Sequence, residues 1–139
     1  MEVEKEIIIE FNKMLLDHSE TLQKISGGLA VVNLLLIANL RHVHPPRSHI
    51  SEASMLVALS AISCGISFVF GYLANSAIIA SMSDYATTGK WEASGIAEWF
   101  TLGQILGLAV AVAVFLFVVV AFRRIALDAL MHVGLGGGK

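Results

Sequence analysis

Five small or polar residues recur at intervals of three or four along an otherwise apolar stretch of the chain: Ser60, Cys64, Ser67, Gly71 and Asn75. On an α-helix this spacing places all five on one face, within about 80° of one another. In hydrocarbon, small side chains let helices approach closely, and polar ones form hydrogen bonds across the contact or face water. The stripe therefore predicts either a helix-packing face or the lining of a polar pathway.

Two other apolar stretches carry features of the same kind. Asn33 is the deepest polar residue of the first stretch, where a ring of amides around a symmetry axis would constrict a pore and a single amide would specify helix pairing. Gly103, Gly107 and Ala111 follow one another at four-residue intervals in the last stretch. Such a run of small residues forms a shallow groove, so we expect a neighbouring helix to pack against it.

Residues suited to catalysis or metal binding are scarce. The sequence has no Gly-rich phosphate loop, no His-Glu-x-x-His motif, no nucleophile paired with a base, and no carboxylate within the apolar stretches. His42, His44 and His49 share one segment, but no nearby Cys or Asp completes a metal site. We expect no enzyme activity, no cofactor and no bound metal. The net charge of -2, without a dense basic cluster, also argues against nucleic-acid binding.

The composition indicates the environment of the chain. Apolar residues make up 56% of the 139 residues and charged residues only 14%, whereas soluble proteins contain about 25% charged residues. A lipid-facing surface accounts for this excess, and the single cysteine excludes an internal disulfide. We therefore predict an all-α integral membrane protein with three transmembrane helices in a small bundle, which is expected to be oligomeric.

The predicted transmembrane domain covers residues 25–122, with spans at 25–40, 53–82 and 99–122. The first span is roughly 24 Å long and short for a hydrocarbon core of about 30 Å, whereas the second, at about 45 Å, exceeds it. The second span must therefore tilt, kink near Gly65 or Gly71, or project from the membrane.

Two polar segments separate the spans. The prolines at 45 and 46 predict a loop over residues 41–49, since proline ends a helix. Residues 83–98 are polar and rich in turn formers. Aromatic residues suited to the headgroup layer lie in this segment and directly after it, namely Tyr85, Trp91 and Trp99. Residues 123–139 form a short C-terminal tail.

Residues 1–24 predict an amphipathic helix that continues directly into the first span. Its apolar stripe, spaced by three and four, comprises Ile7, Phe11, Met14, His18, Leu22 and Ile25. Six acidic residues against three basic ones argue against docking on anionic lipid. The stripe is instead expected to pack against a protein helix, with His18 as a packing residue.

The basic residues suggest an orientation. The first loop and the tail, which three spans place on the same side, hold five of the nine Lys and Arg residues, and several of these lie at span ends. The positive-inside rule therefore predicts an N-terminus outside and a C-terminus in the cytoplasm.

Three functions fit these features. The first is a subunit of a homo-oligomeric channel or pore, whose contacts require self-association but no unseen partner, and we rank it first. The second is a non-catalytic accessory or structural subunit of a larger membrane complex, with the same surfaces packed against other membrane subunits. In size, in its three spans and in the predicted orientation, the chain also resembles a phage holin of the three-span type. This resemblance of topology implies membrane permeabilisation as a third function.

Overall fold

The computed structural model describes residues 2–40, 47–89, 95–123 and 127. Within these residues the chain forms three helices, α1 (Glu2–Leu40), α2 (Arg47–Thr88) and α3 (Gly95–Ala121). Each helix is long and apolar enough to cross a membrane. The prediction of an all-α chain with three apolar, membrane-length helices is therefore confirmed.

The first helix runs without interruption from its charged N-terminal half into the apolar span. Its 39 residues pass through Gly27 and Gly28 as regular helix, so the expected continuity at Lys24 is confirmed. Neither glycine has an atom of another element within reach of an added Cβ. No close contact therefore requires a glycine at either position, and α1 extends about 58 Å.

The second helix is longer at both ends than the sequence predicted. It starts at Arg47, so the prediction of a loop through His49 is wrong, because the residues that follow a proline can begin a helix at once. It also continues to Thr88 in the segment expected to be turn-rich. There Thr87 and Thr88 donate their hydroxyls to backbone carbonyls of the preceding turn, and the side chains do not interrupt the helix.

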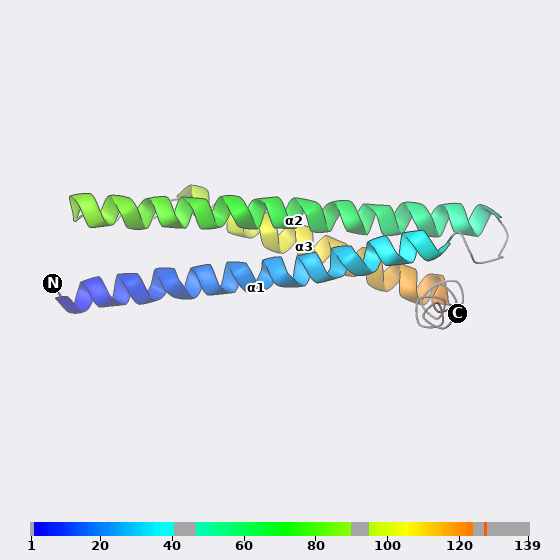
Figure 1. Ribbon diagram of the computed structural model, residues 1–139, viewed down its shortest axis with the longest axis horizontal. Coiled ribbons are helices and arrows are strands. Elements are labelled where there is room, and N and C mark those ends of the chain that lie inside the picture. Colours follow the sequence, from blue (N-terminus) through cyan, green and yellow to red (C-terminus); the bar gives the residue numbers. More distant parts are fainter. Residues whose placement is uncertain (1, 41–46, 90–94, 124–126, 128–139) are drawn as a thin grey trace, which may run out of the picture.

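The end of α2 is set by Gly89. This glycine has a φ of 68°, in the left-handed region that residues with a Cβ seldom adopt. Its N–H donates to the carbonyl of Tyr85 at 2.9 Å, the hydrogen bond of an αL cap. The 42 residues of α2 therefore form one helix of about 63 Å that continues through Gly65 and Gly71. Figure 1 shows it as a nearly straight rod.

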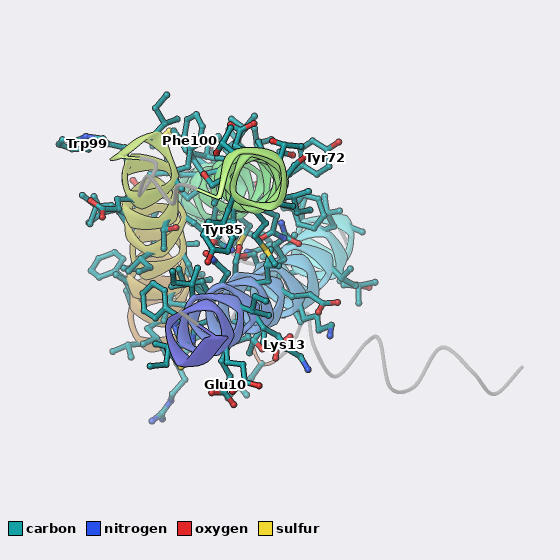
Figure 2. All side chains as sticks on the ribbon, turned by 90° about the vertical axis from the view of Figure 1, so that its left-hand side faces the viewer. Glu10, Lys13, Tyr72, Tyr85, Trp99 and Phe100 are labelled. Carbon is teal, nitrogen blue, oxygen red and sulfur yellow. The ribbon has the colours of Figure 1, made fainter. Side chains whose placement is uncertain are left out.

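The helices form an elongated bundle in which α1 and α3 run in the same direction and α2 runs in the opposite one (Figure 1). Helix α3 crosses behind α2, and α1 and α2 diverge toward the N-terminus of α1. Figure 2, viewed from that end, shows Tyr72 and Trp99 pointing away from the bundle, as do Glu10 and Lys13 on α1. Large apolar side chains thus cover much of the outside.

Among the described residues, a cluster of buried apolar side chains lies at one end of the bundle. It consists of Leu36, Leu40, Val57 and Val118, with Phe115 and Phe122 packed against it. Further along the bundle, the buried positions of the three helices are mainly small or polar. These polar positions form the site described next.

Candidate functional site

The face that α1 turns inward is polar and repeats every seven residues. Asn12, Ser19, Ser26 and Asn33 are all buried, and Leu40 continues the series. A seven-residue period keeps one seam of a helix against its neighbours in a left-handed bundle. This repeat is visible in the sequence, but it is overlooked when apolar residues alone are taken to mark the packed face.

The same period runs along the facing helices. On α2, Ala53, Ser60, Ser67 and Ala74 are buried seven residues apart, and Cys64 lies buried between two of them. On α3, Gln104, Ala111 and Val118 are buried at the same interval. Four residues of the polar stripe predicted on the second span, Ser60, Cys64, Ser67 and Gly71, thus lie inside the protomer.

Ser26, Ser67 and Gln104 link all three helices. The Ser67 hydroxyl donates to the backbone carbonyl of Gln104 at 2.8 Å. Because a serine has a single hydroxyl proton, the 3.0 Å contact between the Ser26 and Ser67 oxygens must be donated by Ser26. A directed hydrogen-bond relay therefore runs from α1 through α2 to α3.

A second relay repeats this arrangement seven residues away. The side-chain amide of Asn33 donates to the Ser60 hydroxyl oxygen at 2.9 Å, and Ser60 donates to the carbonyl of Ala111, also at 2.9 Å. In both relays an α2 serine accepts from α1 and donates to an α3 carbonyl. The two rungs are about 10 Å apart along the helix axes.

A third contact joins α1 directly to α3. Ser19 donates its hydroxyl to Oε1 of Gln104 at 3.0 Å, and Nε2 of Gln104 donates to the Ser19 carbonyl at 2.9 Å. The Gln104 amide lies against Gly71 of α2, where an added Cβ would be 2.5 Å from Nε2. Glycine at 71 thus makes room for the glutamine. We call the six residues of these three rungs the polar ladder: Ser19, Ser26, Asn33, Ser60, Ser67 and Gln104.

The groove of small residues on α3 lies directly under α2. A Cβ at Gly107 would be 3.1 Å from the backbone nitrogen of Ser67, and one at Gly103 would be 2.9 Å from the Phe70 ring. Ala111, the last residue of the groove, is fully buried. The Phe70 and Phe100 rings pack with their centroids 6.1 Å apart beside the groove. The close helix approach brings Ser60 and Ser67 within reach of the α3 carbonyls.

Two amide oxygens inside the bundle have no hydrogen-bond partner among the described residues. They are Oδ1 of Asn33 and Oδ1 of Asn75. Asn75 is half-buried and belongs to none of the three rungs. Of the predicted stripe, Ser60 and Ser67 belong to a rung, whereas Cys64 and Asn75 do not. An unpaired buried amide oxygen is costly in an apolar medium, so these two atoms are the weak points of the polar interior.

The ladder has the chemistry of a structural element. Each of its serine hydroxyls donates within the bundle, and the Ser26–Ser67 rung lies about 10 Å from the Asn33–Ser60 rung along the helix axes. Each rung links helices distant in the sequence and adds about 0.6 kcal/mol per hydrogen bond in a membrane. Among the described residues, no group of three or more His, Cys, Asp or Glu is placed to hold a metal.

Most of the apolar stripe predicted on the N-terminal helix is exposed, whereas Leu22 is half-buried. Ile7, Phe11 and Met14 are 62%, 45% and 60% exposed, while Asn12 on another face of α1 is buried. His18 is also exposed in the protomer, and its prediction as a packing residue against a partner helix stays a prediction. Of the predicted aromatic belt, Trp99 is 73% exposed and Tyr85 is half-buried. Trp91, His42 and His44 lie outside the described residues.

No protein-family model, no curated protein and no solved structure matches this chain.

Proposed function

We propose that this protein is a non-catalytic structural subunit of a membrane protein complex, which holds a protein-binding helical arm at the bilayer surface. The observation that carries this proposal is the division of its polar and apolar surfaces. The polar ladder residues turn inward and bond one another, whereas the N-terminal stripe of α1 turns large apolar side chains outward. The polar stripe of α2 is thereby used within the protomer and does not face a partner.

The lengths of the helices define the arm. On α1 the segment from Glu20 to Leu40 is roughly 30 Å long, which matches the hydrocarbon core. The residues of α1 before this segment extend beyond it, and the antiparallel α2 accompanies them because Ser26 faces Ser67 and Asn33 faces Ser60. We define the arm as residues 2–17 of α1 and 76–88 of α2.

The arm combines water-compatible charges with an apolar stripe. Glu6, Glu10 and Lys13 are exposed on the same helix segment as Phe11 and Met14. Outside hydrocarbon, an exposed row of large apolar side chains is stabilised by burial against another protein. The stripe, spaced by three and four, suits a partner helix that contributes a matching apolar face.

A photo-crosslinking amino acid at Met14, which is 60% exposed, introduced in intact cells, tests this proposal. We expect a discrete adduct with a protein other than the chain itself. The matched control is Val31, which is 56% exposed but lies in the apolar span, and it should crosslink mainly to lipid. Absence of any protein adduct at position 14 would overturn the proposal. The chain has a mass of 14.9 kDa. An adduct with twice this mass would overturn the proposal of a foreign partner and indicate self-association.

Self-association would support the second candidate, a homo-oligomeric channel or pore. The exposed stripe of α1 favours it, because its spacing also suits a coiled coil between copies. A pore would then need polar lining, and Asn75, whose amide oxygen lacks a partner among the described residues, is the first candidate. The test is ion flux into reconstituted vesicles. If Asn75→Leu and Ser67→Leu leave this flux unchanged, α2 does not line the ion path.

We propose the orientation with the N-terminus outside and the C-terminus in the cytoplasm. Single cysteines at Met14 and Leu127, in a Cys64→Ala background, provide the test. In intact cells a membrane-impermeant maleimide is expected to label position 14 and spare position 127. Labelling of position 127 alone would reverse the orientation.

The holin-like alternative rests on topology and predicts abrupt loss of the membrane potential on expression.

A further inference from the structure

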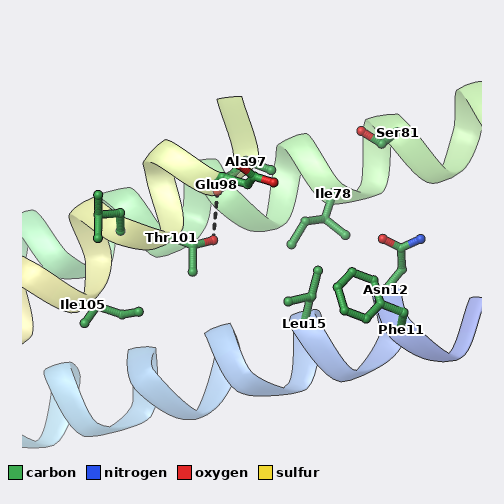
Figure 3. Close-up of a pocket in the computed structure, with 10 residues that line it drawn as sticks. Phe11, Asn12, Leu15, Ile78, Ser81, Ala97, Glu98, Thr101 and Ile105 are labelled. Carbon is green, nitrogen blue, oxygen red and sulfur yellow. Dashed lines mark hydrogen bonds between the residues drawn. The ribbon is translucent and has the colours of Figure 1, made fainter. Parts of the chain in front are cut away.

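A cavity of about 350 Å³ lies at the base of the arm, between all three helices. Figure 3 shows Phe11 and Leu15 of α1 facing Ile78 of α2, with Thr101 and Ile105 of α3 alongside. Ten residues line it: Phe11, Asn12, Leu15, Ile78, Ser81, Ala97, Glu98, Thr101, Leu102 and Ile105. This volume lies at the low end of the range for ligand pockets, which are mostly apolar with a few polar groups.

The cavity lies where the charged part of α1 faces the start of the charge-free part of α3. Its α3 wall contains Leu102 and Ile105, which lie in the stretch without charges that begins after Glu98. Its α1 wall contains Phe11 and Leu15, in the charged half of that helix. With the arm at the bilayer surface, this position corresponds to the layer where acyl chains meet headgroups, so membrane lipids have access to the cavity.

The polar groups on the cavity wall act as hydrogen-bond acceptors. The hydroxyl of Ser81 donates to the carbonyl of Ala77, and that of Thr101 donates to the carbonyl of Ala97 at 2.8 Å. Their oxygens keep free acceptor positions, while their protons are already donated to their own helices. Asn12 donates one of its two amide protons to the Ile8 carbonyl at 3.0 Å, and its side-chain oxygen is a further acceptor.

The only charge among the lining residues is the carboxylate of Glu98. On the adjoining turns of α1, Glu10 and Asp17 are acidic and Lys13 is basic, so the surroundings do not attract an anion. A carboxylate with neighbouring acceptor oxygens is complementary to a primary ammonium, which offers three N–H donors. Glu98 also lies in the first turn of α3.

We propose that this cavity binds a membrane lipid whose headgroup carries a primary ammonium, of the phosphatidylethanolamine class. An acyl chain occupies the apolar wall formed by Leu15, Leu102 and Ile105, and the ammonium lies at Glu98. The inference rests on the proposed placement of the arm at the bilayer surface, but not on which protein the arm binds.

Native mass spectrometry of the full chain released from detergent tests the proposal. The protein is equilibrated with equal amounts of phosphatidylethanolamine, phosphatidylcholine and phosphatidylglycerol. We expect phosphatidylethanolamine to be retained about tenfold over phosphatidylcholine, whose quaternary ammonium has no N–H donor. Preferential retention of phosphatidylglycerol, or equal retention of all three lipids, would overturn the proposal.

Three variants locate the binding. Glu98→Gln should reduce the preference for phosphatidylethanolamine to near unity, and Ala97→Phe, which fills the cavity, should abolish lipid retention. Glu10→Gln, an exposed acid outside the lining, should change neither. Continued protection of the buried Cys64 thiol shows that each variant is folded. A preference that survives both Glu98→Gln and Ala97→Phe would place the lipid elsewhere. Dodecylamine is added as a competing amine. Retention of dodecylamine without retention of phosphatidylethanolamine would make the ligand a soluble amine and overturn the lipid assignment.

Discussion

Gly107→Ala is a stringent test of the helix packing because two effects oppose each other. In a helix interior alanine is favoured over glycine by about 1 kcal/mol. At position 107, however, the new Cβ would lie 3.1 Å from the backbone nitrogen of Ser67 and 3.2 Å from its Cα. Backbone atoms cannot rotate away as a flexible side chain can, so α2 would have to move away from α3.

The size of the effect follows from a comparison with Gly28→Ala. Gly28 is exposed on α1, and nothing lies within 4 Å of an added Cβ, so this variant gains the helix preference alone. Overpacking costs about 1–3 kcal/mol. Because the helix preference cancels between the two variants, Gly107→Ala should be less stable than Gly28→Ala by that amount. This corresponds to about 5- to 150-fold in the opening equilibrium.

The single cysteine provides the assay. Cys64 is 1% exposed in the folded bundle, so its alkylation rate in a titration with sodium dodecyl sulfate reports opening of the helices. Rates are normalised to the fully denatured chain of each variant. If Gly107→Ala opens no more readily than Gly28→Ala, then α2 does not approach α3 as closely as the Ser67 contact requires, and the reasoning fails.

Three further predictions concern the polar interior. In a double-mutant cycle of Ser19→Ala and Gln104→Leu, the coupling energy should be about 0.6–1.7 kcal/mol, and a coupling of zero would show that the Ser19 contact adds no stability. Gly71→Ala should lower the free energy of unfolding of the bundle by about 1–3 kcal/mol, because the new Cβ displaces the Gln104 amide. This loss should be smaller in a Gln104→Ala background; an unchanged loss would mean that Gly71→Ala acts through another contact. In intact bilayers a water-soluble maleimide should leave Cys64 unmodified while labelling Met14→Cys in a Cys64→Ala background; rapid labelling of Cys64 would indicate a water-filled interior.

The sequence by itself was sufficient for the helical, membrane-length character of the chain. Long apolar stretches with few charges leave no alternative to helices, because backbone groups in hydrocarbon must be satisfied within the segment. The unbroken passage of α1 through Lys24 also followed from local sequence. The four-residue spacing of Gly103 and Gly107 marked a surface that another helix can approach closely. The ends of α2 were less predictable, because turn-forming residues such as Thr88 are compatible with helix when their hydroxyls bond to the preceding turn.

Only the tertiary structure decided which helix faces meet. In water an apolar stripe marks the buried side of a helix, but in a membrane lipid is as apolar as a protein core, and the inward side is marked by small and polar residues. Val31, in the apolar span of α1, therefore points outward, whereas the polar Ser26 points inward. Ser19 also points inward and meets Gln104 from 85 positions away along the chain. That partnership depends on the crossing of α1 and α3 over Gly71, a geometry that no local spacing specifies.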